Sequence, residues 1–209
     1  MTWKVLLATS NPGKVRELRA LLSDLKVDVL SPAEAGVDYH AEETGDTFAD
    51  NAIIKAEALS LASGLPAVAD DSGLEVDALG GRPGVRSARF AGEGATDAAN
   101  NEKLLALMQD VPAERRGGRF VSAVALAVPG KPTRVSEGAC QGVVGGHPRG
   151  AGGFGYDPLF VCQDPDPEAG WIGANGLTYA EMTDEQKNLI SHRARAMRGL
   201  RGMLEAELR

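Results

Sequence analysis

The sequence predicts an α/β protein built on a mixed β-sheet. In the first half of the chain, short apolar runs alternate with amphipathic helical patterns, which is typical of this fold class. A long strand-like run at 119–128 is followed by Pro129-Gly130-Lys131-Pro132 and a second run at 133–144, which predicts a hairpin. A sheet that holds both crossover connections and a hairpin mixes parallel and antiparallel strands.

The elements follow from apolar periodicity and from the residues that bound it. The expected strands lie at 4–9, 27–30, 67–70, 74–79, 119–128, 133–144 and 158–161. The first expected helix follows Gly13 and carries Val15, Leu18, Leu22 and Leu25 on one face. Further helices are expected from Thr47 to Ser63, after Thr96, and over a tail from 184 to 208 that opens with a Thr183–Gln186 capping box.

The organisation of the chain indicates one domain over residues 1–209. The sequence contains no internal repeat, low-complexity segment or clear linker. The glycine-rich segment 142–155 is the one feature that favours a division into two lobes.

The composition excludes several functional classes. The net charge of −7 makes the chain a poor general binder of nucleic acid, whose affinity comes from neutralised phosphates. No apolar run approaches the roughly 20 residues that span a bilayer, and the first residues lack the pattern of a signal peptide. Cys140 and Cys162 have neither metal-ligand spacing nor a disulfide framework. We therefore expect a cytoplasmic protein without membrane or nucleic-acid partners.

The turn after the first strand has the character of an anion site. The stretch "VLLATSNPGK" at 5–14 passes from apolar residues through small polar ones to Gly13-Lys14, where a helical pattern begins. It does not match the phosphate-binding P-loop pattern. Free backbone N–H groups at a helix start still favour an anion, and Lys14 adds a full positive charge. The alternative is a capped helix with an exposed lysine.

Acidic residues later in the chain could form a metal site. Asp70-Asp71 is expected where a strand ends, the usual place for active-site residues in an α/β sheet. Together with Glu42 or Glu43 they would offer the oxygen ligands that Mg²⁺ prefers. The alternative is a polar turn. Lys55 lies on the helix that is expected to begin after Thr47, and its local sequence alone predicts a lysine on the protein surface.

Two stretches in the second half suggest a pocket for a nucleotide base. In "GGFGYDP" at 152–158, Phe154 or Tyr156 could stack on a base, although a glycine-rich turn with buried aromatic rings is the alternative. In "SHRARAM" at 191–197, His192 and Arg193 could donate to a carbonyl or a phosphate, although a structural histidine is the alternative. His40 and His147 are assigned no role.

Taken together, five stretches resemble the inosine/xanthosine triphosphate pyrophosphatase family. They are "TSNPGK", "EETGDTFADNAIIKA", "ADDSGLEVDALGGRPGVRSARFAG", "GGFGYDPLF" and "SHRARAM", in the order in which the family has them. The resemblance runs from residue 5 to about 198, with 110–150 the least diagnostic part. It implies an elongated α/β fold with two lobes around a long mixed sheet, a substrate cleft between the lobes, and a homodimer.

The resemblance also implies a reaction and a set of site residues. The family hydrolyses dITP, ITP and XTP to the monophosphate and pyrophosphate and requires Mg²⁺, which cleanses the nucleotide pool. The implied metal ligands are Glu42 and Asp71, with Asp71 also the proton acceptor. The implied substrate-binding residues are Thr9, Ser10, Asn11, Pro12, Gly13, Lys14, Lys55, Ser72, Phe154, Gly155, Tyr156, Asp157, Lys187, His192 and Arg193.

Three other functions remain open at this point. A Maf-like pyrophosphatase would act on pyrimidine or modified nucleotides, but "SHRARAM" and "FGYD" argue against it. A nucleotide-binding sensor without turnover would not need the complete carboxylate set. A structural or interaction protein would leave the clustered polar turns unexplained.

Overall fold

The computed structural model describes residues 3–9, 11–163 and 176–207, and the chain divides into two compact units. The first unit consists of residues 1–71, 122–138 and 193–209, and the second of residues 72–121 and 139–192. Three strands contribute residues to both units.

The mixed sheet predicted from the sequence is confirmed. Within the described residues its strand order is β2-β1-β3-β4-β5-β6. β1 pairs in parallel with β2 and with β3, whereas β5 and β6 are antiparallel. The strands are β1 (Trp3–Leu7), β2 (Val27–Leu30), β3 (Ala67–Val76), β4 (Gly117–Ala127), β5 (Arg134–Val144) and β6 (Phe160–Cys162).

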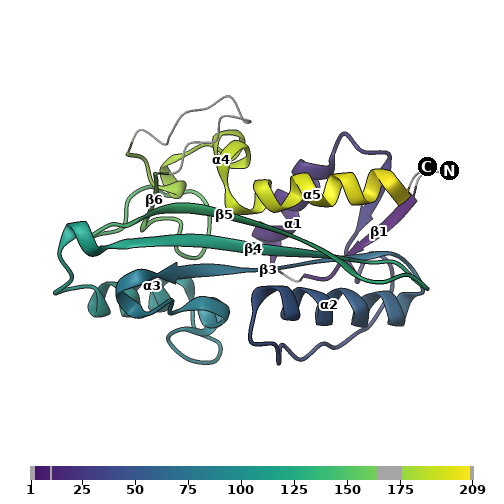
Figure 1. Cartoon of the computed structure of the whole chain (residues 1–209), viewed down its shortest axis with the longest axis horizontal. Coiled ribbons are helices and arrows are strands. Elements are labelled where there is room, and N and C mark those ends of the chain that lie inside the picture. The colour runs from purple at the N-terminus through teal and green to yellow at the C-terminus, as the bar shows by residue number, and fades with distance from the viewer. Residues whose placement is uncertain (1–2, 10, 164–175, 208–209) are drawn as a thin grey trace. The chain divides into compact units, whose positions relative to one another are not determined.

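The first unit covers both faces of its part of the sheet with helices. α1 (Pro12–Leu22) and α5 (His192–Glu207) lie on one face, and α2 (Phe48–Ser63) lies on the other (Figure 1). α2 begins and ends as predicted, since the Thr47 side chain caps its first turn and Gly64 follows in the left-handed conformation. The core on the α1 and α5 face is built from Val5, Leu7, Leu18, Leu22, Val68, Val124, Leu126, Met197, Leu200 and Leu204.

The second unit is also layered. α3 (Asp97–Leu107) and α4 (Asp184–Ile190) lie on opposite sides of its strands (Figure 1). Thr96 caps α3, and the predicted capping box of Thr183 and Gln186 opens α4. Its core includes Leu74, Val76, Leu104, Met108, Phe120, Cys140, Phe160, Tyr179 and Ile190.

Two predictions of element boundaries are wrong. The expected strands at 67–70 and 74–79 form one strand, β3, which ends at Val76 and is followed by a 3₁₀ turn. Asp, Ser and Gly are poor strand formers, but partners in the fold override that preference: side chains pair with both aspartates, and Ser87 Oγ accepts from Leu74 N at 3.0 Å. The expected helical tail is likewise two helices, because Ser191 has extended backbone between α4 and α5.

Candidate active site

The turn from β1 to α1 is a capped helix start. Pro12 is the first helical residue, and Asn11 Oδ1 accepts from the N–H groups of Gly13 and Lys14 at 2.9 and 3.2 Å. These two N–H groups are therefore bonded to the helix cap, and the binding of an anion at this turn stays a prediction. The cation of this turn is the Lys14 ammonium. Thr9 accepts from Asn11 N, and Ser10 lies outside the described residues.

The register of the parallel strands explains why Lys14 meets β3. β1 ends at Leu7, which lies opposite Val68, while β3 continues past this point to Val76. Asp70 therefore lies in mid-strand, beside the edge that β1 leaves uncovered. Lys14 Nζ reaches over this edge to Asp70 Oδ2 at 2.7 Å.

Asp70 and Asp71 have different partners because successive strand residues point to opposite faces. Asp70 Oδ1 accepts from Ser122 Oγ at 2.5 Å, and Arg193 of α5 lies 3.5 Å from the same carboxylate. On the other face, Asp71 Oδ1 accepts from Lys55 Nζ of α2 at 2.6 Å. The two carboxylates thus belong to different ion pairs, but Lys14 Nζ and Lys55 Nζ both also approach the main-chain oxygen of Asp70, at 3.4 and 3.1 Å.

These surroundings move the two carboxyl pKa values in opposite directions. Burial raises the pKa of Asp70, but the charges of Arg193 and Lys14 outweigh it and hold the pKa well below its ordinary value. Burial also raises the pKa of Asp71, and there Lys55 and Lys14 offset it only in part. When neighbouring acids differ in this way, the one with the raised pKa is the better proton acceptor.

Lys55 is not the surface lysine that its sequence context suggests. Its side chain is 12% exposed, and its ammonium also donates to Glu43 Oε1 at 2.9 Å. Burial lowers the pKa of Lys55, but Asp71 and Glu43 outweigh burial and raise it overall. The oxygens of Asp71 and Glu43 thus converge on one cation. Glu42, the preceding residue in the sequence, is exposed, as Glu43 is.

Arg193 belongs to this unit as well. Its guanidinium is 1% exposed and donates to Glu17 of α1. Sequence reasoning did not identify Glu17 or Ser122. The available signals were weak: a carboxylate beside Leu18 on the buried face of a helix, and one hydroxyl in an apolar strand. The predicted contact of Arg193 with a base stays a prediction.

The second unit brings together most of the residues predicted for the base. Lys187 Nζ forms a buried ion pair with Asp157 Oδ2 at 2.6 Å and lies 4.7 Å from the ring centroid of Phe154. Cation–π contact with an aromatic ring helps to hold such an ammonium in place. His192 stacks on Phe120 with ring centroids 4.7 Å apart.

Other members of this group have a fixed, structural environment. Tyr156 is 3% exposed and donates its hydroxyl to Ser87 O at 2.9 Å, so Phe154 is the accessible ring of the two. Gly155 is joined to α3, since Asp97 accepts from its N–H at 2.7 Å. Ser72 is half-buried in β3.

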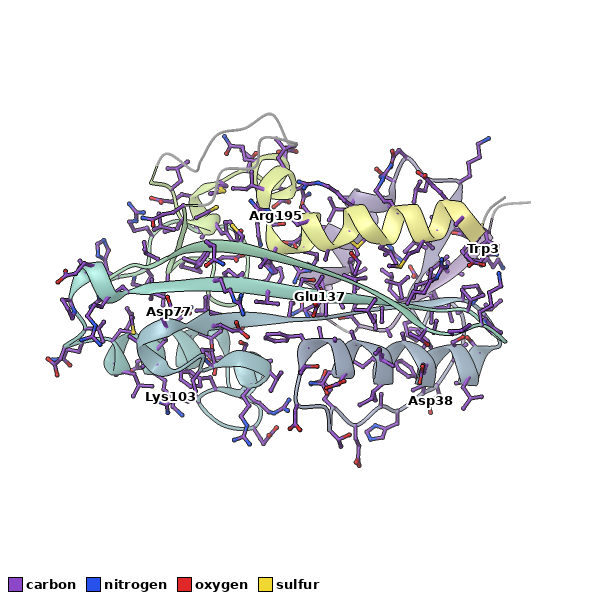
Figure 2. The ribbon with its side chains drawn as sticks, in the orientation of Figure 1. Trp3, Asp38, Asp77, Lys103, Glu137 and Arg195 are labelled. Atoms are coloured by element: carbon purple, nitrogen blue, oxygen red, sulfur yellow. The ribbon has the colours of Figure 1, made fainter. Side chains whose placement is uncertain are left out.

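A pocket of about 930 Å³ opens within the first unit beside the β1–α1 turn. Its volume lies in the range of small-molecule sites. It includes the predicted Thr9, Pro12 and Lys55 and adds Arg16 and Arg19, which sequence reasoning did not single out. Asp38 also lines this pocket and lies on the α2 side of the sheet (Figure 2). Arg195, at the start of α5, lies on the opposite side of the sheet.

The fold and the site define a class of protein. In the first unit, the half-buried Lys14 and Lys55 pair with the adjacent carboxylates of Asp70 and Asp71 on one strand. In the second unit, the buried Lys187 lies over the ring of Phe154. The first of these groups suits an enzyme that acts on phosphate, and the second suits contact with an aromatic ligand. The chain belongs to the Ham1 family, whose model matches residues 5–203.

Similar proteins with curated names support this assignment. The dITP/XTP pyrophosphatase of Bacillus subtilis is 47% identical over 203 residues, which cover 97% of this chain and 98% of that protein. The dITP/XTP pyrophosphatase of Yersinia pseudotuberculosis is 50% identical over 197 residues, which cover 93% of this chain and 94% of that protein. The sequence resemblance to this family is thereby confirmed.

Solved structures confirm the fold. The Staphylococcus aureus Ham1 protein has a TM-score of 0.82 at 38% identity and covers 98% of this chain and 99% of its own. A nucleoside-triphosphatase and dITP/XTP pyrophosphatase from Mycobacterium abscessus has a TM-score of 0.72 at 44% identity. The match covers 94% of this chain and 98% of that protein.

Proposed function

We propose that this protein is a nucleoside-triphosphate pyrophosphatase that hydrolyses dITP, ITP and XTP to the monophosphate and pyrophosphate. Relatives that match over nearly their whole length are named dITP/XTP pyrophosphatase, and we extend the proposal to ITP. The structural observation that carries the proposal is the convergence of two lysines on Asp70-Asp71: Lys14 pairs with the Asp70 carboxylate, Lys55 pairs with the Asp71 carboxylate, and both ammonium groups approach the Asp70 main-chain oxygen. The activity would keep deaminated purines out of DNA and RNA.

The chemistry requires a proton acceptor and positive charge. Water attacks the α-phosphorus, the bond from that phosphorus to the bridging oxygen breaks, and pyrophosphate leaves with the bond electrons. We assign to Asp71 the proton that the attacking water loses. Lys14 and Lys55 offset the charge on the phosphate oxygens, which is the main demand of phosphoryl transfer.

The carboxylates of the first unit fit Mg²⁺. Among the described residues, no three His, Cys, Asp or Glu side chains form a cluster that could hold a metal. Mg²⁺ usually takes only one or two carboxylates and completes its shell with water and substrate phosphates. The proposed ligands are Glu42 and Asp71. Asp71 and Glu43, which follows Glu42 in the sequence, already converge on one cation, the Lys55 ammonium. Bound there, Mg²⁺ would supply charge neutralisation on the triphosphate.

We propose that the second unit recognises the base. Lys187 is a donor only, so it suits the 6-oxo acceptor of hypoxanthine and xanthine and disfavours the 6-amino donor of adenine. Phe154 offers a partly exposed ring for stacking. Asp157 holds the Lys187 ammonium in a fixed position.

Assembly and location are also part of the proposal. The family resemblance favours a homodimer. Cys140 and Cys162 are buried thiols whose sulfur atoms lie 2.9 Å apart without a disulfide, which suits a reducing compartment such as the cytoplasm. None of the helices in the described part of the chain is long and apolar enough to cross a membrane.

The Asp71→Asn variant tests the proposed chemistry. Asparagine keeps the shape of the side chain but loses its charge and basicity, so kcat with saturating ITP and Mg²⁺ should fall at least about 10²-fold. Pyrophosphate release is the readout, with ITP binding and thermal melting measured in parallel. Asp24→Asn is the matched control, because Asp24 pairs with Arg201 on the exposed surface of the same unit. Retention of more than about a tenth of wild-type kcat by Asp71→Asn would assign the proton to another group.

A further inference from the structure

A network of four charged side chains lies behind the β1–α1 turn of the first unit. It consists of two carboxylates, Glu17 and Asp70, and two cations, Lys14 and Arg193. Arg193 donates to Glu17 and lies 3.5 Å from Asp70, and Lys14 Nζ lies 2.7 Å from Asp70 Oδ2. The network is electrically neutral, as a buried set of charges must be to be tolerated.

Among the four side chains of this network, that of Lys14 is the most exposed to solvent. The side chain of Lys14 is 15% exposed, whereas those of Asp70, Arg193 and Glu17 are 0%, 1% and 8% exposed. Lys14 is thus the member of the network that solvent and a ligand can most readily reach. Asp70 is held on its other oxygen by Ser122 Oγ at 2.5 Å, so its Oδ2 has a fixed direction.

We propose that Asp70 is a positioning residue, which fixes the Lys14 ammonium for the substrate phosphates, and that Glu17 and Arg193 hold Asp70 in place for this task. The inference rests on the proposed function, since it takes Lys14 to contact substrate. A lysine has a long, flexible stem and loses much rotamer freedom when it meets a ligand. An ammonium already held by Asp70 has lost that freedom beforehand, which is how preorganised charge stabilises a transition state.

A double-mutant cycle measures whether Asp70 acts through Lys14. The variants are Asp70→Asn, Lys14→Met and the double variant, assayed by pyrophosphate release from ITP with Mg²⁺. We expect kcat/KM to fall about 10²-fold in Lys14→Met and about tenfold in Asp70→Asn. In the double variant, kcat/KM should fall by the same factor as in Lys14→Met alone, because Asp70 has no Lys14 ammonium left to position. A purely structural role of Asp70 would give independent, multiplying losses.

Ser122→Ala provides a second, milder variant in case Asp70→Asn does not fold. It keeps the Asp70 charge and removes one hydrogen bond that orients it, so kcat/KM should fall about threefold, again only when Lys14 is present. Thermal melting confirms that each variant is folded at the assay temperature. Asp24→Asn, in an ion pair elsewhere in this unit, should match the wild type.

Three outcomes would overturn the inference. Multiplying losses in the double variant would show that Asp70 acts independently of Lys14. A lower KM in Asp70→Asn would show that Asp70 restrains Lys14 from the substrate. Full activity of Lys14→Met would remove the group to be positioned, while the proposed function, which depends on Asp71, would be judged by its own variant.

Discussion

Two adjacent aspartates of β3 show how strongly its surroundings determine the pKa of a single carboxyl group. Asp70 faces Arg193, Lys14 and Ser122, and these partners hold its pKa well below the ordinary value. Asp71 faces α2, and burial raises its pKa despite Lys55. Enzymes separate acid and base roles between carboxylates in this way. We therefore propose Asp71 as the proton acceptor and Asp70 as the residue that positions Lys14.

Base selectivity is the second property that belongs to single residues. Lys187→Gln replaces an obligate donor by an amide that both donates and accepts. The ratio of kcat/KM for ITP to that for ATP should therefore fall, by about tenfold or more. Steady-state pyrophosphate release with both nucleotides gives this ratio.

Lys103→Gln is the matched control for this experiment. Lys103 lies in the same unit with its ammonium 4.8 Å from the Phe90 ring, so it shares the cation–π contact but has no assigned role at the base. Its ITP-to-ATP ratio should stay at the wild-type value. An unchanged ratio in Lys187→Gln would remove Lys187 from base discrimination.

Among the helices and strands, helix starts were the most predictable features. Thr47, Thr96 and Thr183 were each identified from sequence, and each side chain accepts a hydrogen bond from the first turn of its helix. Capping is a local interaction between residues two or three apart, so it can be read from a short window. β3 could not be predicted in this way, because the partners that keep it extended come from distant parts of the chain.

Close packing between β5 and β6 gives a stability prediction. A Cβ on Gly142 would lie 2.5 Å from the Phe160 ring and within contact of the neighbouring backbone. Gly142→Ala should therefore destabilise the protein by about 1–3 kcal/mol. Chemical denaturation monitored by circular dichroism measures this difference.

Gly202→Ala is a control for which we expect a change of opposite sign in the free energy of unfolding. Gly202 lies within α5, and an alanine methyl group at this position would meet nothing within 4 Å. Alanine there should stabilise the helix by about 0.5–1 kcal/mol. If Gly142→Ala were equally harmless, the close approach of β5 and β6 would be contradicted.

For the molecule as a whole, the important stretches were easier to predict than the contacts between residues. The five motifs and the mixed sheet were identified, and the second unit does bring Phe154, Asp157 and Lys187 together. The pairing of Glu17 with Arg193 joins residues 176 positions apart, and no local pattern indicates it. Likewise, alternation alone could not show that the adjacent aspartates occupy one continuous strand.

Assembly is the next property of the complete protein. We expect a homodimer, with a mass by multi-angle light scattering of twice the 21.8 kDa chain. The measurement should be made at micromolar concentration and repeated after dilution. A mass equal to one chain at every concentration would contradict this expectation.

Release of pyrophosphate from deaminated purine triphosphates is the property on which the other assignments depend. It is measured with the wild-type chain and Mg²⁺, by following pyrophosphate release from ITP, dITP, XTP, ATP and GTP. We predict kcat/KM for the first three above that for ATP by a large factor, about 10⁴ where the site rejects the 6-amino group fully. We also predict loss of turnover when the metal is chelated. Equal turnover of ITP and ATP, or nucleotide binding without pyrophosphate release, would contradict the proposed function.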